Sequence, residues 1–178
     1  MSSVPSQIEE VVSRRPLHTV EDGTIEQRQL RLLLVCSSGG HLSLMDNLRP
    51  WWGSHERAWV TFPKDDVKSL LGGERVVWAH HPTTRNIPNA VRNYRLATRV
   101  LRDYRPDLVV STGAGVAVPF FLAARRQGIP RVYIEAFERV DSQTLTGRMC
   151  YPISSLFLLQ WPEQQRFYPR GQLIGPLH

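Results

Sequence analysis

Seven short apolar runs recur along the chain, and longer amphipathic segments separate them. Continuous apolar runs of this length are typical of strands buried on both faces of a parallel sheet, with helices as the connections. The sequence therefore predicts an α/β fold with a doubly wound, mostly parallel, Rossmann-like sheet. The expected strands cover residues 32–35, 58–62, 76–78, 108–110, 131–134, 156–159 and 173–174. The expected helices cover residues 41–49, 64–71, 87–104, 116–127, 142–151 and 162–168.

The chain divides into a polar N-terminal segment and one domain. Residues 1–29 show no periodicity and are predicted to form a flexible polar leader, whereas residues 30–178 hold enough apolar sequence for a single core. The leader is too acidic for a signal peptide, and no run reaches the roughly 18 apolar residues of a membrane span. We therefore expect a cytoplasmic protein that contacts a membrane without crossing it.

The charge balance favours an anionic partner. The sequence has 22 lysines and arginines against 16 aspartates and glutamates, which gives a formal net charge of +6. This excess fits a phosphorylated substrate, an anionic membrane or nucleic acid, and it equally fits a basic surface that binds nothing. Nucleic acid is disfavoured because the aromatic residues are not interleaved with the basic ones, as base stacking requires.

The cysteines and histidines do not form a metal-binding pattern. Cys36 and Cys150 each lack a second cysteine at CxxC spacing, and His80 and His81 precede a proline in an expected loop. We therefore expect no metal site and no redox pair.

Small residues follow two of the expected strands, at 37–41 and 111–115. In a doubly wound sheet, ligands bind at the carboxyl ends of the strands, near the point where the strand order reverses. The alternative is a pair of tight turns without a ligand, but two such turns in one sheet favour a site. Neither turn matches a dinucleotide fingerprint, a phosphate loop or a nucleophile elbow. The candidate substrate-binding residues here are Ser37, Ser38, Gly39, Gly40, Thr112, Gly113 and Gly115.

His41 follows the two glycines of the first turn and begins an expected helix. An imidazole at that place accepts or donates a proton near neutral pH, so His41 is a candidate general base. The alternative is a capping or surface histidine.

The order of these motifs resembles a known family. Ser-Gly-Gly-His at 38–41, Ser-Thr-Gly-Ala-Gly at 111–115 and Ile-Pro-x-x-Tyr-Ile-Glu at 129–135 resemble the asparagine-linked-glycosylation-fourteen-type glycosyltransferase subunits. The similarity covers about residues 31–177. The sequence resembles the bacterial PssD/CpsF-like polysaccharide proteins more closely, because the eukaryotic members begin with a membrane anchor that is not expected here. The family is similar to the N-terminal half of GT-B enzymes such as MurG.

The resemblance implies half of an enzyme that acts in capsule or exopolysaccharide biosynthesis. A sugar would pass from a UDP-sugar to a lipid-diphosphate-linked acceptor, on the inner face of the plasma membrane. His41 would be the base, with Glu135 as the second candidate. A separate PssE-like, asparagine-linked-glycosylation-thirteen-type subunit would bind most of the donor, and no cofactor is implied. Ala114 and Val116 depart from the second turn of MurG.

Several residues near these motifs have two interpretations. Phe120, Phe121, Arg125 and Arg126 combine apolar and cationic character, which suits an anionic membrane surface, but the aromatic pair also fits the core. Arg139 is a candidate phosphate ligand that equally fits an ion pair with Glu138 or Asp141. The pair at 51–52, Trp-Trp, suits a lid or an interfacial anchor.

Two other functions remain open from the sequence. The chain is alternatively a non-catalytic membrane scaffold that recruits and activates the donor-binding partner. A free-standing nucleotide-binding domain is the third possibility, and the missing fingerprint argues against it.

Overall fold

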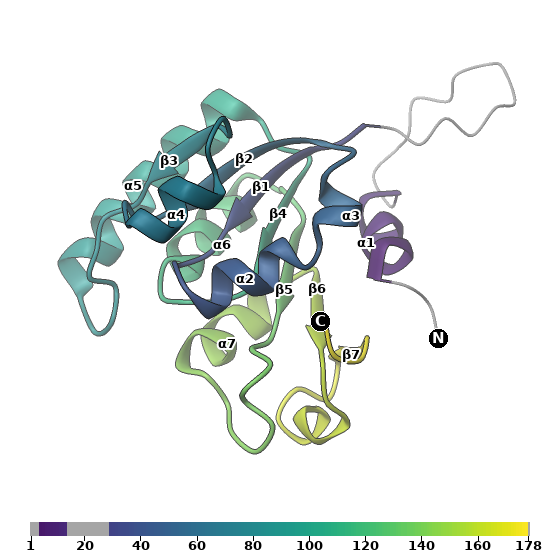
Figure 1. Cartoon of the computed structure of the whole chain (residues 1–178). Helices are drawn as coiled ribbons and strands as arrows, with labels where there is room; N and C mark the ends of the chain where they lie inside the picture. Colours follow the sequence, from purple (N-terminus) through teal and green to yellow (C-terminus); the bar gives the residue numbers. More distant parts are fainter. Residues whose placement is uncertain (1–3, 14–28, 178) are drawn as a thin grey trace, which may run out of the picture.

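The computed structural model describes residues 4–13 and 29–177. Seven parallel strands form one sheet in the order β3-β2-β1-β4-β5-β6-β7 (Figure 1). This order confirms the predicted doubly wound, Rossmann-like α/β fold, because the chain runs outward from β1 in one direction and from β4 in the other. The strands are β1 Arg31–Val35, β2 Glu56–Thr61, β3 Val76–Trp78, β4 Leu108–Ser111, β5 Arg131–Ile134, β6 Leu156–Leu159 and β7 Gln172–Leu173.

Helices cover both faces of the sheet (Figure 1). Alternate residues of β1 point to opposite faces, so Leu33 packs with α5, α6 and α7, while Leu32 packs with α1 to α4. The helices are α1 Val4–Ser13, α2 Gly40–Asp46, α3 Arg49–Trp52, α4 Asp65–Leu70, α5 Ile87–Tyr104, α6 Ala117–Arg126 and α7 Leu145–Cys150. Two 3₁₀ helices, η1 Tyr151–Ile153 and η2 Pro162–Arg166, complete the fold.

The N-terminal segment differs from its prediction. Residues 4–13 form the helix α1 rather than an irregular leader, and Ile8 and Val12 are buried in the core that includes α2, α3 and α4. Ile8 and Val12 are one helical turn apart, so they lie on the same face of α1. Residues 1–3 and 14–28 of the predicted leader lie outside the described residues. Within the described ranges, no helix combines the length and apolar character needed to cross a bilayer.

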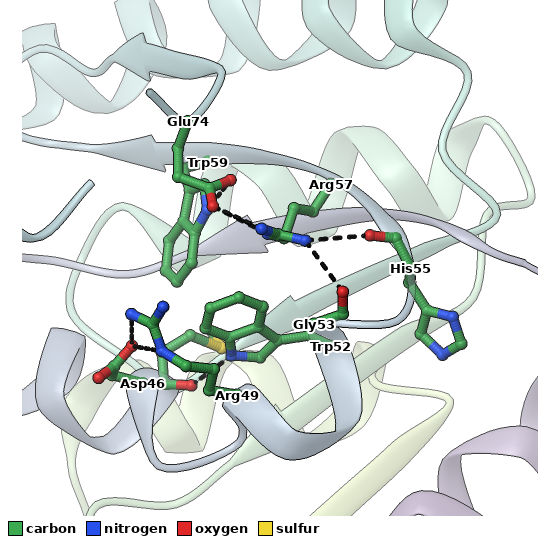
Figure 2. Close-up of polar contacts among 9 residues, drawn as sticks. Asp46, Arg49, Trp52, Gly53, His55, Arg57, Trp59 and Glu74 are labelled. Carbon is green, nitrogen blue, oxygen red and sulfur yellow. Dashed lines mark hydrogen bonds and ion pairs between the residues drawn. The ribbon is translucent and has the colours of Figure 1, made fainter. Parts of the chain in front are cut away.

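Trp51 and Trp52 are core residues, so the prediction of a lid or an interfacial anchor is wrong. The Trp52 indole donates to the Met45 carbonyl at 2.8 Å. Figure 2 shows its ring between two guanidinium groups, those of Arg49 and Arg57, which lie 4.9 and 4.7 Å from the ring centroid. These cations stabilise the ring where the core reaches the surface.

Candidate functional site

The two small-residue turns meet at the reversal point of the sheet, because β1 and β4 are hydrogen-bonded neighbours. A cavity of about 600 Å³ opens there. The first turn contributes Ser37, Ser38 and His41 to its lining, and the second contributes Ala114 and Gly115. The other lining residues are Phe62, Lys64, His81, Pro82, Thr83, Thr84, Arg139, Leu145 and Thr146.

A reciprocal pair of hydrogen bonds joins the two turns. His41 Nδ1 lies 2.7 Å from the Thr112 carbonyl oxygen, and the Thr112 hydroxyl donates to the His41 carbonyl at 2.7 Å. A carbonyl oxygen only accepts, so Nδ1 carries a proton in this contact and, in the neutral ring, Nε2 has a free lone pair. The geometry therefore holds the imidazole in the tautomer that a general base needs.

Gly113 makes room for this imidazole. A Cβ at position 113 would lie 2.8 Å from His41 Cε1 and 3.2 Å from the Tyr133 hydroxyl, and the backbone has φ +118°. Both the close contact and the left-handed region favour glycine.

Several of the predicted substrate-binding groups already have hydrogen-bond partners within the protein. The Thr112 side chain is buried and bonded to His41, so it is not available to a substrate. The N–H of Gly113 donates to Ser111 Oγ at 3.1 Å, and the N–H of Gly39 donates to Asp66 at 3.1 Å. Ser37, Ser38 and Gly115 do line the cavity, and Gly40 is exposed at the start of α2.

Glu135, the second candidate base, lies outside the cavity lining, and its catalytic role stays a prediction. Its side chain is fully buried, does not line the cavity, and accepts hydrogen bonds from the Ala136 N–H at 2.9 Å and the Thr144 hydroxyl at 3.1 Å. Burial raises the pKa of this carboxyl above its ordinary value of 4.5, while hydrogen bonding by Tyr168, Ala136 and Thr144 and the nearby charge of His41 oppose the rise. Thr144 is the N-cap of α7, so Glu135 fixes the start of that helix.

The raised pKa of Glu135 predicts a pH dependence of stability. The folded state binds the proton more tightly than the unfolded chain, so this contribution is fully present below the ordinary pKa and is lost as pH rises through the raised one. Glu135→Gln should remove this contribution, so the free energy of unfolding should depend less on pH in that range. Urea denaturation from acidic to neutral pH measures it, with Glu138→Gln, an exposed carboxyl in the same loop, as the control. The same change in unfolding free energy with pH in wild type and in Glu135→Gln would contradict this assignment.

Basic side chains line the cavity, and none of its lining residues is a carboxylate. Lys64 follows β2, His81 follows β3, and Arg139 lies in the loop after β5. The Arg139 guanidinium lies 3.5 Å from Ser142 Oγ, while the neighbouring Asp141 pairs with Arg166 at 3.0 Å. Among the described residues, no ion pair joins Arg139 to Glu138 or to Asp141, so the predicted alternative of an ion pair is not seen and the cavity has the charge to attract an anion.

Lys64 and His81 line the cavity but were not among the predicted site residues. Both follow the carboxyl ends of strands, so the same rule that selected the glycine turns was sufficient to find them.

The predicted membrane contact is wrong for its aromatic pair. Phe120 and Phe121 are fully buried, and the Phe121 ring packs edge-on against Tyr133 at 6.0 Å. Arg125 and Arg126 are exposed in the last turn of α6, where the helix dipole also favours positive charge. Their contact with a membrane stays a prediction. Within the described ranges, no group of three metal-ligating side chains is close enough to hold an ion.

The fold occurs in known glycosyltransferases. The structure matches that of MurG from Acinetobacter baumannii with a TM-score of 0.63 and 18% identity, over 76% of this chain and 42% of MurG. This chain therefore spans less than half the length of that structure. A UDP-N-acetylglucosamine–N-acetylmuramyl-(pentapeptide) pyrophosphoryl-undecaprenol N-acetylglucosamine transferase from Lachnoclostridium phytofermentans is 30% identical over 47% of this chain and 23% of its own length.

Sequence comparison identifies the family. UDP-N-acetylglucosamine transferase subunit ALG14 of mouse is 26% identical over 84% of this chain and 83% of its own. Residues 74–177 match the family described as oligosaccharide biosynthesis protein Alg14 like. The predicted family is thus confirmed, whereas its bacterial PssD/CpsF-like branch stays a prediction. The chain belongs to the Alg14-like family of oligosaccharide biosynthesis proteins.

Proposed function

We propose that this chain is the acceptor-binding subunit of a two-subunit glycosyltransferase. The enzyme moves a sugar from a UDP-sugar to an acceptor linked to a lipid diphosphate. The observation that carries the proposal is the cavity at the point where the strand order of the sheet reverses. His41 lines this cavity together with Lys64 and Arg139, and no carboxylate is among the lining residues. Membership of the Alg14-like family and the MurG-like fold support it.

The cationic side chains fit the acceptor's diphosphate. Lys64 and Arg139 come from different loops and line the same cavity as His41. Charged hydrogen bonds to a phosphate are stronger than neutral ones, and an arginine fork binds two oxygens at once. The diphosphate would be fixed by these side chains rather than by the glycine N–H groups, because those of Gly39 and Gly113 already have acceptors.

The imidazole then performs the proton transfer. As the acceptor hydroxyl attacks C1 of the donor sugar, a C–O bond forms and the bond from C1 to the UDP oxygen breaks. His41 Nε2 takes the hydroxyl proton, and UDP leaves with the electron pair. Attack from the face opposite to UDP inverts the configuration at C1.

The donor would be bound mainly by a partner subunit of the PssE-like type. The match to MurG covers 42% of that protein, and the resemblance to GT-B enzymes implies that the nucleotide is held by the other half. The pair would work in bacterial capsule or exopolysaccharide biosynthesis, peripherally on the inner face of the plasma membrane. Exposed Arg125 and Arg126 support contact with anionic lipid there.

Sugar transfer into membrane lipid tests the proposed function. Radiolabelled UDP-sugars are offered to this chain alone, to a candidate donor-binding subunit alone, and to the co-expressed pair. We expect label in the lipid fraction only with the pair. Tight nucleotide binding by this chain alone, without transfer by any combination, would instead favour a free-standing nucleotide-binding domain.

Removing either cavity cation should weaken acceptor binding. Lys64→Ala and Arg139→Ala should each raise KM for the lipid acceptor by about tenfold or more, because a hydrogen bond to a charged group contributes about 1.5 to 3 kcal/mol. The control is Lys68→Ala, an exposed lysine of α4 that pairs with Asp65. Steady-state kinetics of the pair measures the effect, and an unchanged KM in both variants would contradict the assigned diphosphate site.

A further inference from the structure

The loop that carries Arg139 is fixed from behind by Gln164, a residue of η2. The Gln164 side chain is fully buried. Its amide nitrogen donates to the carbonyls of Ala136 and Arg139, each at 3.1 Å. Its amide oxygen accepts the N–H groups of Gln160 at 2.9 Å and Trp161 at 3.2 Å. One side chain therefore joins the end of β6 to the loop after β5.

All of these contacts are needed to satisfy a buried amide. A glutamine side chain has two N–H donors and one carbonyl oxygen with two lone pairs, and Gln164 uses each of them. Buried polar networks of this kind specify one backbone arrangement, because any other leaves donors or acceptors unsatisfied.

Other contacts hold the same loop through its backbone. The Trp161 indole donates to the Phe137 carbonyl at 2.7 Å, and the Gln160 amide donates to the Glu135 carbonyl at 2.8 Å. The Arg139 guanidinium, in contrast, reaches only Ser142 at 3.5 Å in the hydrogen bonds of the described residues. The placement of this cation therefore depends on the backbone that Gln164 fixes, and not on a carboxylate partner.

We propose that Gln164 is a positioning residue for anion binding, which acts by fixing the loop that presents Arg139 to the cavity. This inference rests on the proposed function, in which Arg139 binds a diphosphate. Gln164→Glu tests it, because the change keeps the side-chain shape but replaces the two donors by an oxygen that faces two carbonyls.

Inorganic pyrophosphate is the probe, and its affinity is measured by calorimetry on the full chain. Arg139→Ala and Gln164→Glu should each weaken binding by about tenfold, which corresponds to the loss of one hydrogen bond to a charged group. The double variant should bind no more weakly than Arg139→Ala alone, because Gln164 acts through Arg139. Gln165→Glu, an exposed neighbour on η2, is the matched control and should bind as wild type does.

The outcomes separate this inference from the function on which it rests. Equal pyrophosphate affinity in wild type and Arg139→Ala would remove Arg139 from the diphosphate site, and with it the reason for a positioning residue. Weak binding by Arg139→Ala with unchanged binding by Gln164→Glu would overturn the positioning role alone. Additive losses in the double variant would show that Gln164 acts on the whole fold.

A second measurement uses the unmodified protein and does not depend on the folding of a variant. Binding at Arg139 should stabilise the loop, and by reciprocity the contacts that hold it. Pyrophosphate should therefore slow hydrogen exchange at the N–H groups of Gln160 and Trp161, which donate to Gln164. Unchanged exchange at saturating pyrophosphate would overturn the inference.

Discussion

His41→Asn should reduce sugar transfer by the two-subunit enzyme by about 10²- to 10⁴-fold, the usual contribution of a general base. The asparagine amide can still donate to the Thr112 carbonyl, the acceptor of His41 Nδ1, so the link between the two turns is retained. It has no basic nitrogen at the position of Nε2, so the acceptor hydroxyl keeps its proton. The measurement is kcat with saturating lipid acceptor and UDP-sugar.

His80→Ala is the matched control for this prediction. His80 is exposed after β3 and does not line the cavity, so transfer should be unchanged. Co-purification of the partner with each variant shows whether assembly is intact. Full transfer with His41→Asn would make this chain a scaffold that recruits its partner, and the base would then belong to the partner.

Gly147→Ala should destabilise the fold and displace the start of α7. A Cβ at position 147 would lie 2.5 Å from the Tyr168 hydroxyl and 2.7 Å from Thr144 Oγ1, and it would also meet Glu135 Oε2. Glu135 and Tyr168 are buried, so these atoms cannot easily give way. Overpacking of this kind costs about 1 to 3 kcal/mol, and we expect the upper end of that range. At about 2 to 4 °C per kcal/mol, Tm should fall by roughly 6 to 12 °C.

Thermal unfolding followed by circular dichroism measures this effect. The control is Gly72→Ala, where a Cβ would make only ordinary contacts, at 3.8 Å from two carbonyl oxygens. An unchanged Tm in Gly147→Ala would mean that α7 adjusts at little cost. Loss of acceptor binding is expected together with the loss of stability, because Leu145 and Thr146 of α7 line the cavity.

The sheet was predictable from the sequence because its central strands are buried on both faces. All seven predicted runs fall within two residues of the observed strand at each end, and 76–78, 131–134 and 156–159 match β3, β5 and β6 at both ends. The helix at 87–104 was also predicted with its observed bounds. Continuous apolar runs and a long amphipathic period lie within single segments. They can therefore be recognised without knowledge of the tertiary contacts.

The roles of single side chains were less predictable because they depend on contacts between distant segments. Phe120 resembles a membrane residue in a sequence, but the turn of α6 that carries it faces the sheet. Glu135 follows a strand end as a catalytic residue would, yet its carboxylate turns toward Thr144 and not toward the cavity. The basic residues that line the cavity, Lys64, His81 and Arg139, come from three different loops, so no short motif contains them.

The contact between Trp161 and the Arg139 loop gives the protein an internal optical reporter. The Trp161 indole donates to the Phe137 carbonyl, and its ring packs at 5.1 Å from the Phe137 ring. Trp51, Trp52 and Trp59 are buried in the layer that contains α2, and Trp78 is exposed at the end of β3, away from this loop in the sequence. Indole emission shifts with the polarity around the ring. A change in this loop when a ligand binds should therefore appear as a change in intrinsic fluorescence, without a label attached near the cavity.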